Sequence, residues 1–328
     1  MSAQSAVSHK FRFCLLGMCL AVLLICSQPA GVCQSGGTPP LEMKISLPKS
    51  VFLVGEPVLI KCEFTNVSNE NVGFVPMLLV DFDFIGFRIK RPDGTIYKFR
   101  PGVIVDVIPD TVVTSTVLSP GEGLDHVINP IVGVIGKGED SDLNFVMRVP
   151  GTYEITAAYE NSIEFTKAAI WRGKLTSNTV SLRVEGPTGD DAAAFSAVWN
   201  SLPVWRYLGY PGYGSGPKQI EAFKTLLRKY PDSVYALYAN YYLAEAYQTI
   251  NPHQFDAAIA QYRVALGRLP QTHRLYALSE FNLGVCLCST GKTSEGVETL
   301  KHFLSTQKTL SLQVVKARKL IASAEKAQ

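Results

Sequence analysis

The side chains that most often carry out catalysis are scattered through this sequence. Five histidines stand at positions 9, 126, 253, 273 and 302, and none has the spacing of a zinc-binding motif. The GxSxG nucleophile motif, the phosphate-binding GxxxxGK(S/T) loop and the GxGxxG dinucleotide fingerprint are also absent from the sequence. These observations argue against the common hydrolase, nucleotide-binding and metalloprotease classes.

Two groups of acidic residues are the remaining candidates for chemistry. Asp81 and Asp83 alternate with phenylalanines, so they would lie on one face of a strand. Acid–base catalysis also needs a partnered base and a cleft, and the sequence indicates neither. Glu139, Asp140 and Asp142 lie close together, but they lack the spacing and the terminal glutamate of an EF-hand loop. We therefore predict a chain that is not an enzyme and has no metal site or cofactor.

One aromatic stretch is a better candidate for binding. Residues 198–217, VWNSLPVWRYLGYPGYGSGP, place large rings among glycines. The candidates in this loop are Trp199, Trp205, Tyr207, Tyr210 and Tyr213. Such a composition suits stacking against sugars or an adaptable protein contact. The alternative is that the rings pack the first helix of the second domain against the first domain.

Length and composition set the number of domains. The chain has 328 residues, 47% of them hydrophobic, and a formal net charge of +3. This length is enough for two domains with hydrophobic cores. The nearly neutral charge balance gives no electrostatic footprint for nucleic acid, so we expect none as a partner.

Residues 1–33 have the layout of a secretory signal peptide. A basic start is followed by the apolar run FCLLGMCLAVLLIC (13–26) and then by small and polar residues. The run is shorter than the roughly 20 residues that a membrane-spanning helix needs. We therefore expect export, cleavage between Ala30 and Gly36, and no transmembrane span in the mature chain. Retention as an N-terminal anchor is the alternative.

The exported chain is expected in the periplasm, at the cell envelope or outside the cell. A lipid anchor at Cys33 is a weaker alternative, because Val32 precedes it where lipoproteins carry a small residue. The other cysteines beyond the apolar run are Cys62, Cys286 and Cys288. They form no obvious disulfide framework, and we expect them to be small core residues.

Residues 41–186 have a hydrophobic period of two. In GTYEITAAYE (151–160), for example, apolar and polar residues alternate, which predicts a strand with one buried face. Turn sequences such as RPDGT (91–95) separate such runs, and about seven short strands indicate an antiparallel β-sandwich. The stretch resembles the immunoglobulin-like modules of bacterial envelope proteins. The resemblance is carried by GEPVLIKCEFTNVS (55–68), RPDGTIYKF (91–99), LSPGEG (118–123), PGTYEITAAY (150–159) and SNTVSLRV (177–184).

A linker, a helix and the aromatic loop occupy residues 187–217, and residues 218–328 have a helical period. LAEAY (243–247) returns as LGVCL (283–287), forty residues further on. This half resembles the tetratricopeptide repeat of bacterial envelope proteins, a helix–turn–helix unit that stacks into an α-solenoid. The first repeat matches at Leu243, Ala244, Tyr247, Ala258, Tyr262, Ala265 and Pro270. The second matches at Leu283, Gly284, Leu287, Gly296 and Leu300, with Phe303 where a small residue is usual.

The resemblance also implies a binding groove, which this family lines with the first helix of each repeat. YANYYLAEAY (238–247) contains four tyrosines. Helical spacing assigns Tyr247 to the core and Tyr242 to a contact with a neighbouring helix. The groove candidates are Tyr238, Tyr241, Glu245, Gln248, Leu278, Phe281 and Val285. A protein or peptide partner is one occupant of such a groove; the C-terminal helix or the β domain is the other.

These patterns predict an exported, non-catalytic protein–protein interaction protein, an adaptor or assembly factor of the cell envelope. The fold class is a multidomain β-then-α chain, an immunoglobulin-like β-sandwich followed by a short tetratricopeptide solenoid. The alternative function is a carbohydrate-binding or proteinase-inhibitor-like β-sandwich, with the helices as a rigid spacer.

Overall fold

The structure is a computed structural model, and it describes most of the chain after the N-terminal segment. The described residues are 39–75, 85–99, 116–129, 132–134, 143–145, 147–161, 170–201, 204, 208, 216–307 and 311–327. They all belong to one compact unit, Pro39–Gln328. The predicted signal peptide and Cys33 lie outside the described residues, as do the acidic candidates Asp81, Asp83, Glu139, Asp140 and Asp142.

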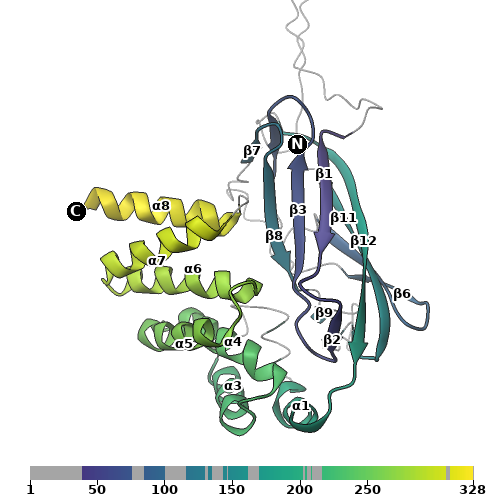
Figure 1. The fold of residues 1–328 in the computed structure, drawn as a ribbon, viewed down its shortest axis with the longest axis vertical. Coiled ribbons are helices and arrows are strands. Elements are labelled where there is room, and N and C mark those ends of the chain that lie inside the picture. Colours follow the sequence, from purple (N-terminus) through teal and green to yellow (C-terminus); the bar gives the residue numbers. More distant parts are fainter. Residues whose placement is uncertain are drawn as a thin grey trace, which may run out of the picture. The chain divides into compact units, whose positions relative to one another are not determined.

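The first part of this unit is built from strands, as the period of two predicts. A three-stranded antiparallel sheet has the order β1 (Leu41–Ser46), β3 (Ile60–Asn66), β8 (Gly123–Ile128). A five-stranded sheet has the order β2 (Val51–Leu53), β12 (Gly173–Glu185), β11 (Gly151–Asn161), β5 (Ile85–Lys90), β6 (Ile96–Phe99). Two small pairs complete the described strands: β4 (Val72–Phe74) with β7 (Thr116–Leu118), and β9 (Val132–Val134) with β10 (Leu143–Phe145). The larger strands run through the β domain in Figure 1.

The two larger sheets share one hydrophobic core. Alternate residues of β1 and β3 are buried, because successive side chains of a strand point to opposite faces. Phe64 of β3 meets Tyr159 of β11 edge to face, with ring centroids 5.1 Å apart. The Asn178 side chain of β12 bonds both backbone groups of Ile45 in β1, donating to the carbonyl at 3.0 Å and accepting from the amide at 2.8 Å.

The second part consists of helices, and the change from strand to helix falls between Glu185 and Gly189. The helices are α1 (Gly189–Ala194), the π-helix η2 (Phe195–Trp199), α3 (Pro217–Lys229), α4 (Val234–Thr249), α5 (Phe255–Arg268), α6 (Arg274–Ser289), α7 (Thr293–Thr306) and α8 (Leu312–Ala327). From α3 onward each helix packs on the next one in sequence (Figure 1). Within the described residues, none of the helices is long and apolar enough to cross a membrane.

The helical core extends into the β domain. One hydrophobic cluster contains Trp199, Phe223 and the tyrosines of α4 together with Leu59, and Val127 of β8 packs against it. A second, smaller cluster joins α6, α7 and α8 through Phe281, Leu300 and Phe303 among others. Apolar side chains around α4 therefore pack the helical part against the β part.

Candidate functional site

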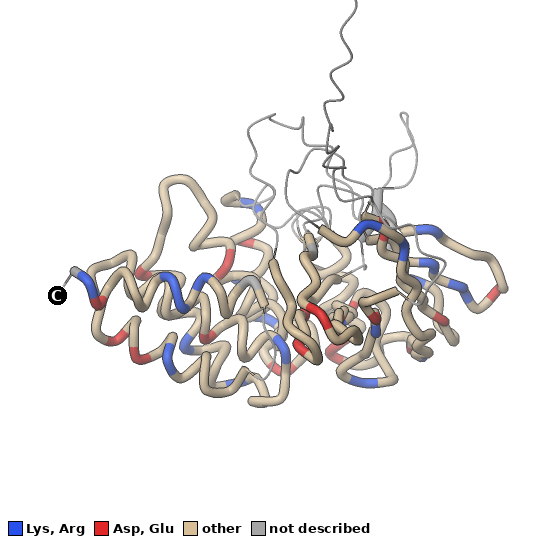
Figure 2. The backbone as a smooth tube through the Cα atoms, turned by 90° about the horizontal axis from the view of Figure 1, so that it is seen from above, with Lys and Arg blue, Asp and Glu red and all other residues tan. Residues whose placement is uncertain are grey.

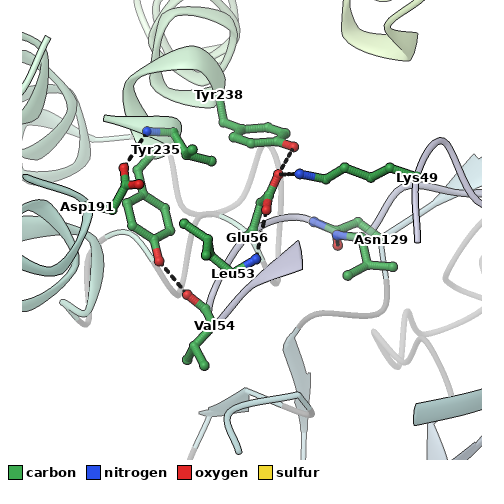
Figure 3. Close-up of polar contacts among 10 residues, drawn as sticks. Lys49, Leu53, Val54, Glu56, Asn129, Asp191, Tyr235 and Tyr238 are labelled. Atoms are coloured by element: carbon green, nitrogen blue, oxygen red, sulfur yellow. Dashed lines mark hydrogen bonds and ion pairs between the residues drawn. The ribbon is translucent and has the colours of Figure 1, made fainter. Parts of the chain in front are cut away.

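The turn that follows β2 is held by three aromatic side chains from the helices. Tyr235 of α4 donates its hydroxyl hydrogen to the Val54 carbonyl at 2.6 Å, and the Trp199 indole donates to the Gly55 carbonyl at 2.8 Å. Tyr238, one turn further along α4, donates to Oε1 of Glu56 at 2.6 Å (Figure 3). Three consecutive residues of the β domain are thus each bonded to a ring of the helical part. We call residues 54–56 and these three rings the junction.

Glu56 is the charged centre of the junction. Its side chain is 1% exposed, yet the carboxylate has a partner on each side. Lys49 Nζ lies 2.5 Å from Oε1, and the Leu53 amide donates to Oε2 at 2.9 Å (Figure 3). A buried carboxylate is tolerated when it is paired and hydrogen-bonded in this way. Burial and the negative charge of Glu56 together raise the pKa of Tyr238, so its hydroxyl remains a donor.

Gly55 allows the close approach. Its φ of +80° lies in the left-handed region, and a Cβ there would come within 2.6 Å of the Phe195 ring. On the helical side, the Asp191 carboxylate accepts from the Val234 amide at 2.6 Å, which ties α1 to the start of α4 (Figure 3). The junction therefore joins the β2 turn, α1, η2 and α4.

Two of the four first-repeat groove candidates are buried, and the other two, Glu245 and Gln248, are half-buried. Tyr238 is 3% exposed at the junction, and Tyr241 is 5% exposed beside the ring of Tyr262 on α5. Tyr241 donates to Glu245 at 3.2 Å, and Tyr262 donates to Gln248 at 2.7 Å. Burial and the charge of Glu245 raise the pKa of Tyr241, which keeps this internal network in its donor form. The contact of Tyr238 with Glu56 fits the alternative in which the β domain covers this half of the groove, whereas Tyr241 is covered by α5 of its own repeat.

The second-repeat candidates have a different environment. Phe281 is buried against Phe303 of α7, with ring centroids 5.5 Å apart. Leu278 and Val285 remain half-buried on α6, and they are seven residues apart, so they lie on similar faces of the helix. Leu278 packs against the cluster that holds the α4 tyrosines, and Val285 packs against the cluster that Phe281 shares with α8. This half of the predicted groove is apolar, and the C-terminal helix α8 covers part of it.

The other tyrosines of YANYYLAEAY are where helical spacing predicts them. Tyr247 is buried, and Tyr242 stacks on Phe223 of α3 with ring centroids 6.2 Å apart. In the aromatic loop, Trp199 lies fully buried in the junction, which fits the packing alternative. The other four loop candidates, Trp205, Tyr207, Tyr210 and Tyr213, lie outside the described residues.

Sequence reasoning missed Gly55 and Glu56, the β-domain half of the junction. They stand in the ordinary turn sequence VGEPV, and no local signal shows that their partner helix lies far along the chain. The separation between Glu56 and Tyr238 is 182 residues. Within the described part of the chain, no group of three or more His, Cys, Asp or Glu residues could hold a metal ion.

Comparisons with known proteins give little further guidance. No family model matches the chain, and no curated protein matches it. Among solved structures, the CARDB domain of a Pyrococcus furiosus protein is 15% identical, with 45% of this chain and 89% of that chain covered and a TM-score of 0.22. A mutant β-glucosidase from Listeria innocua in complex with laminaribiose is 13% identical, with 45% and 16% covered and a TM-score of 0.24. Likenesses this low in TM-score carry no argument about function.

Proposed function

We propose that this chain is an exported, non-catalytic protein–protein interaction protein, an adaptor or assembly factor of the cell envelope. In this proposal an immunoglobulin-like β-sandwich carries a short tetratricopeptide α-solenoid. The solenoid presents a partly apolar helical surface at α6–α8 to a protein or peptide partner.

The packing of small residues supports the repeat assignment. A Cβ on Gly284 of α6 would lie 2.7 Å from Leu300 of α7, and one on Gly296 would lie 2.6 Å from Cys288. These glycines therefore allow α6 and α7 to approach closely, which is the role of the small positions in stacked helical repeats. Ala244 and Ala258, the equivalent positions of the first repeat, are fully buried.

The junction is the observation that carries the functional proposal. It fixes α4 and η2 against the β domain through three hydrogen bonds, two from α4 and one from η2, and through a buried cluster of rings. A helical surface held in a fixed orientation loses less conformational entropy when a partner binds. The surface offered lies beyond the junction, where Leu278 and Val285 of α6 are half-buried and apolar.

The test is a capture experiment with residues 39–328 as bait, against an envelope extract. A matched bait carries Leu278→Gln and Val285→Gln, and a control bait carries Val264→Gln on α5, where Val264 is 45% exposed. The captured protein is then purified and titrated against each bait. We expect the double variant to weaken binding at least about tenfold, equivalent to about 1.4 kcal/mol, and the control to leave it unchanged.

Two results would contradict the proposal. One is that no protein binds the parent bait saturably after purification. The other is that all three baits bind the purified protein equally while circular dichroism shows each of them folded. Thermal unfolding of each bait separates a lost contact from a lost fold.

A further inference from the structure

The outward face of the five-stranded sheet carries an unusual row of side chains. Lys98 of β6 lies directly opposite Arg88 of β5, Arg88 lies opposite Thr156 of β11, and Thr156 lies opposite Thr179 of β12. Residues directly opposite each other on neighbouring strands project from the same face of the sheet. The row therefore places two cations and two hydroxyl groups side by side across four strands.

The two cations of this row are not compensated by an acid within the described residues. Both residues are exposed, and neither takes part in an ion pair between described residues. The next row shows the ordinary arrangement, because both oxygens of Glu154 lie within 3.3 Å of Lys90. Like charges directly opposite each other on two strands destabilise the pairing. Elsewhere basic and acidic residues are interspersed along the chain (Figure 2).

A hollow lies beside this row. Its volume is about 480 Å³, and Arg88, Thr156 and Thr179 of this row line it together with the ion pair of Lys90 and Glu154 from the next row. The neighbouring row is formed by Gly86, Ala158 and Thr176, whose small side chains leave the sheet surface low. The register of β11 against β12 also shifts between Thr156 and Ala158, and such bulges are frequent next to binding sites. A volume of this size falls within the range of small-molecule sites, about 300–1,000 Å³.

The lining indicates the chemistry of the ligand. The guanidinium of Arg88 is a planar fork that suits a carboxylate or a phosphate. Lys98, opposite Arg88 on β6, adds a second positive charge beside the hollow. The Thr156 and Thr179 hydroxyls lie 2.9 Å apart and both can donate or accept, as sugar hydroxyls require. Among the lining residues the exposed large apolar side chain is Ile96, and no aromatic ring is present. Protein interfaces centre on aromatic and apolar anchors, so a protein partner suits this surface less well.

We propose that this hollow binds an acidic sugar. The carboxylate or phosphate of the ligand lies between Arg88 and Lys98, and its hydroxyl groups bond Thr156 and Thr179. The ligand is the size of a monosaccharide or the end of a longer acidic glycan. This site is on the β domain, away from the helical surface proposed above, so the two proposals stand or fall separately.

The experiment is calorimetric titration of residues 39–328 with four probes: glucuronate, glucose 6-phosphate, glucose and inorganic phosphate. We expect saturable binding of one or both acidic sugars, and much weaker binding of glucose and of phosphate. The variant Arg88→Gln/Lys98→Gln should weaken that binding at least about tenfold. The control Lys174→Gln removes a cation of the same sheet that is already paired with Glu160, 3.0 Å away, and should change nothing.

A second variant tests the hydroxyl groups without changing the charge. Thr156→Val/Thr179→Val should weaken the acidic sugars several-fold and leave phosphate binding unaltered. The proposal is overturned if neither acidic sugar saturates below about 10 mM. It is also overturned if glucose or phosphate binds as tightly as the acidic sugars, or if Arg88→Gln/Lys98→Gln, folded by circular dichroism, binds them as well as the parent chain does.

Discussion

The two helical repeats share one sequence pattern but are attached to the β domain in different ways. Around the start of α4 every junction donor has an acceptor: Tyr235 and Tyr238 of α4 and Trp199 of η2 bond the turn at 54–56. Forty residues later, α6 begins with Arg274, whose Nε is buried without a hydrogen-bond partner in the described part of the chain. The Ser279 hydroxyl and Oε2 of Glu280 are likewise buried and unpartnered there.

This difference shows what the repeat pattern controls and what it leaves free. The small and large residues that let helices stack are retained in both copies, as Ala244 and Gly284 illustrate. The residues at the helix starts are not retained, because they contact whatever lies beyond the repeat. In the first copy they fix α4 to the β domain. In the second copy the Arg274 Nε has no hydrogen-bond partner among the described residues. We therefore expect the molecule to be more stable at the α4 end than at the α6 end.

The largest loss of stability is expected from removing the Trp199 indole of the junction. Trp199 is fully buried and bonded to Gly55, so Trp199→Ala leaves a large cavity and an unpaired carbonyl. We expect a loss of about 3–5 kcal/mol in the free energy of unfolding, measured by urea denaturation. Val264→Ala on the exposed face of α5 is the control and should change stability by less than about 0.5 kcal/mol. A loss below 1 kcal/mol (about the mean for any point mutation) in Trp199→Ala would show that the junction does not anchor the helices.

We expect low pH to destabilise the fold where the start of α6 faces β8. His126 of β8 has its pKa lowered to about 4 by burial and by the positive charge of Arg274, against the opposing effect of Asp125. The unfolded chain therefore binds this proton at a higher pH than the folded chain does, since an unperturbed histidine has a pKa near 6.5. Stability from this group is fully present above pH 6.5 and is lost as the pH falls toward 4, by about 3 kcal/mol.

The measurement is urea denaturation at a series of pH values between 7 and 4, roughly the window set by the two pKa values. His126→Gln cannot take up the proton, so its stability should change less over that range. Parallel pH profiles for the parent and the variant would contradict the assignment to His126.

Exchanging residues between the repeats tests the comparison directly. Tyr238→Leu gives the first repeat the residue that the second has at this position, and it removes a buried donor to Glu56. Glu56 keeps Lys49 and the Leu53 amide, so we expect a loss of only about 1–2 kcal/mol. The reverse exchange, Leu278→Tyr, falls on a half-buried position and should cost less than about 0.5 kcal/mol. Equal losses in thermal or urea unfolding would mean that the two helix starts are equivalent.

Much of the fold could be predicted from the sequence because it depends on local periodicity. The alternation in GTYEITAAYE (151–160) corresponds to the alternately buried strand β11, and the repeat at 243–247 and 283–287 lies on α4 and α6. The positions of the binding candidates could not be predicted in the same way. Helical spacing predicted the face of the helix on which Tyr238 lies, but it could not predict which residue covers that face. The covering residue, Glu56, is 182 residues away in the sequence. The row from Lys98 to Thr179 likewise depends on strand register, which composition does not determine.

The smallest effect on stability is expected at the start of α6, and it decides how the two ends differ. The buried Arg274 Nε makes no hydrogen bond within the described residues, so Arg274→Met loses little there and replaces a charge by an apolar chain of similar length. At neutral pH the free energy of unfolding should therefore stay within about 0.5 kcal/mol of the parent value.

The same charge lowers the pKa of His126, so the variant should raise that pKa, measured by nuclear magnetic resonance titration of the imidazole. The free energy of unfolding that is lost between pH 7 and pH 4 should therefore be smaller in this variant. A variant that is clearly less stable at neutral pH, with the His126 pKa unchanged, would mean that Arg274 holds α6 against β8 and that both ends of the helical row are anchored.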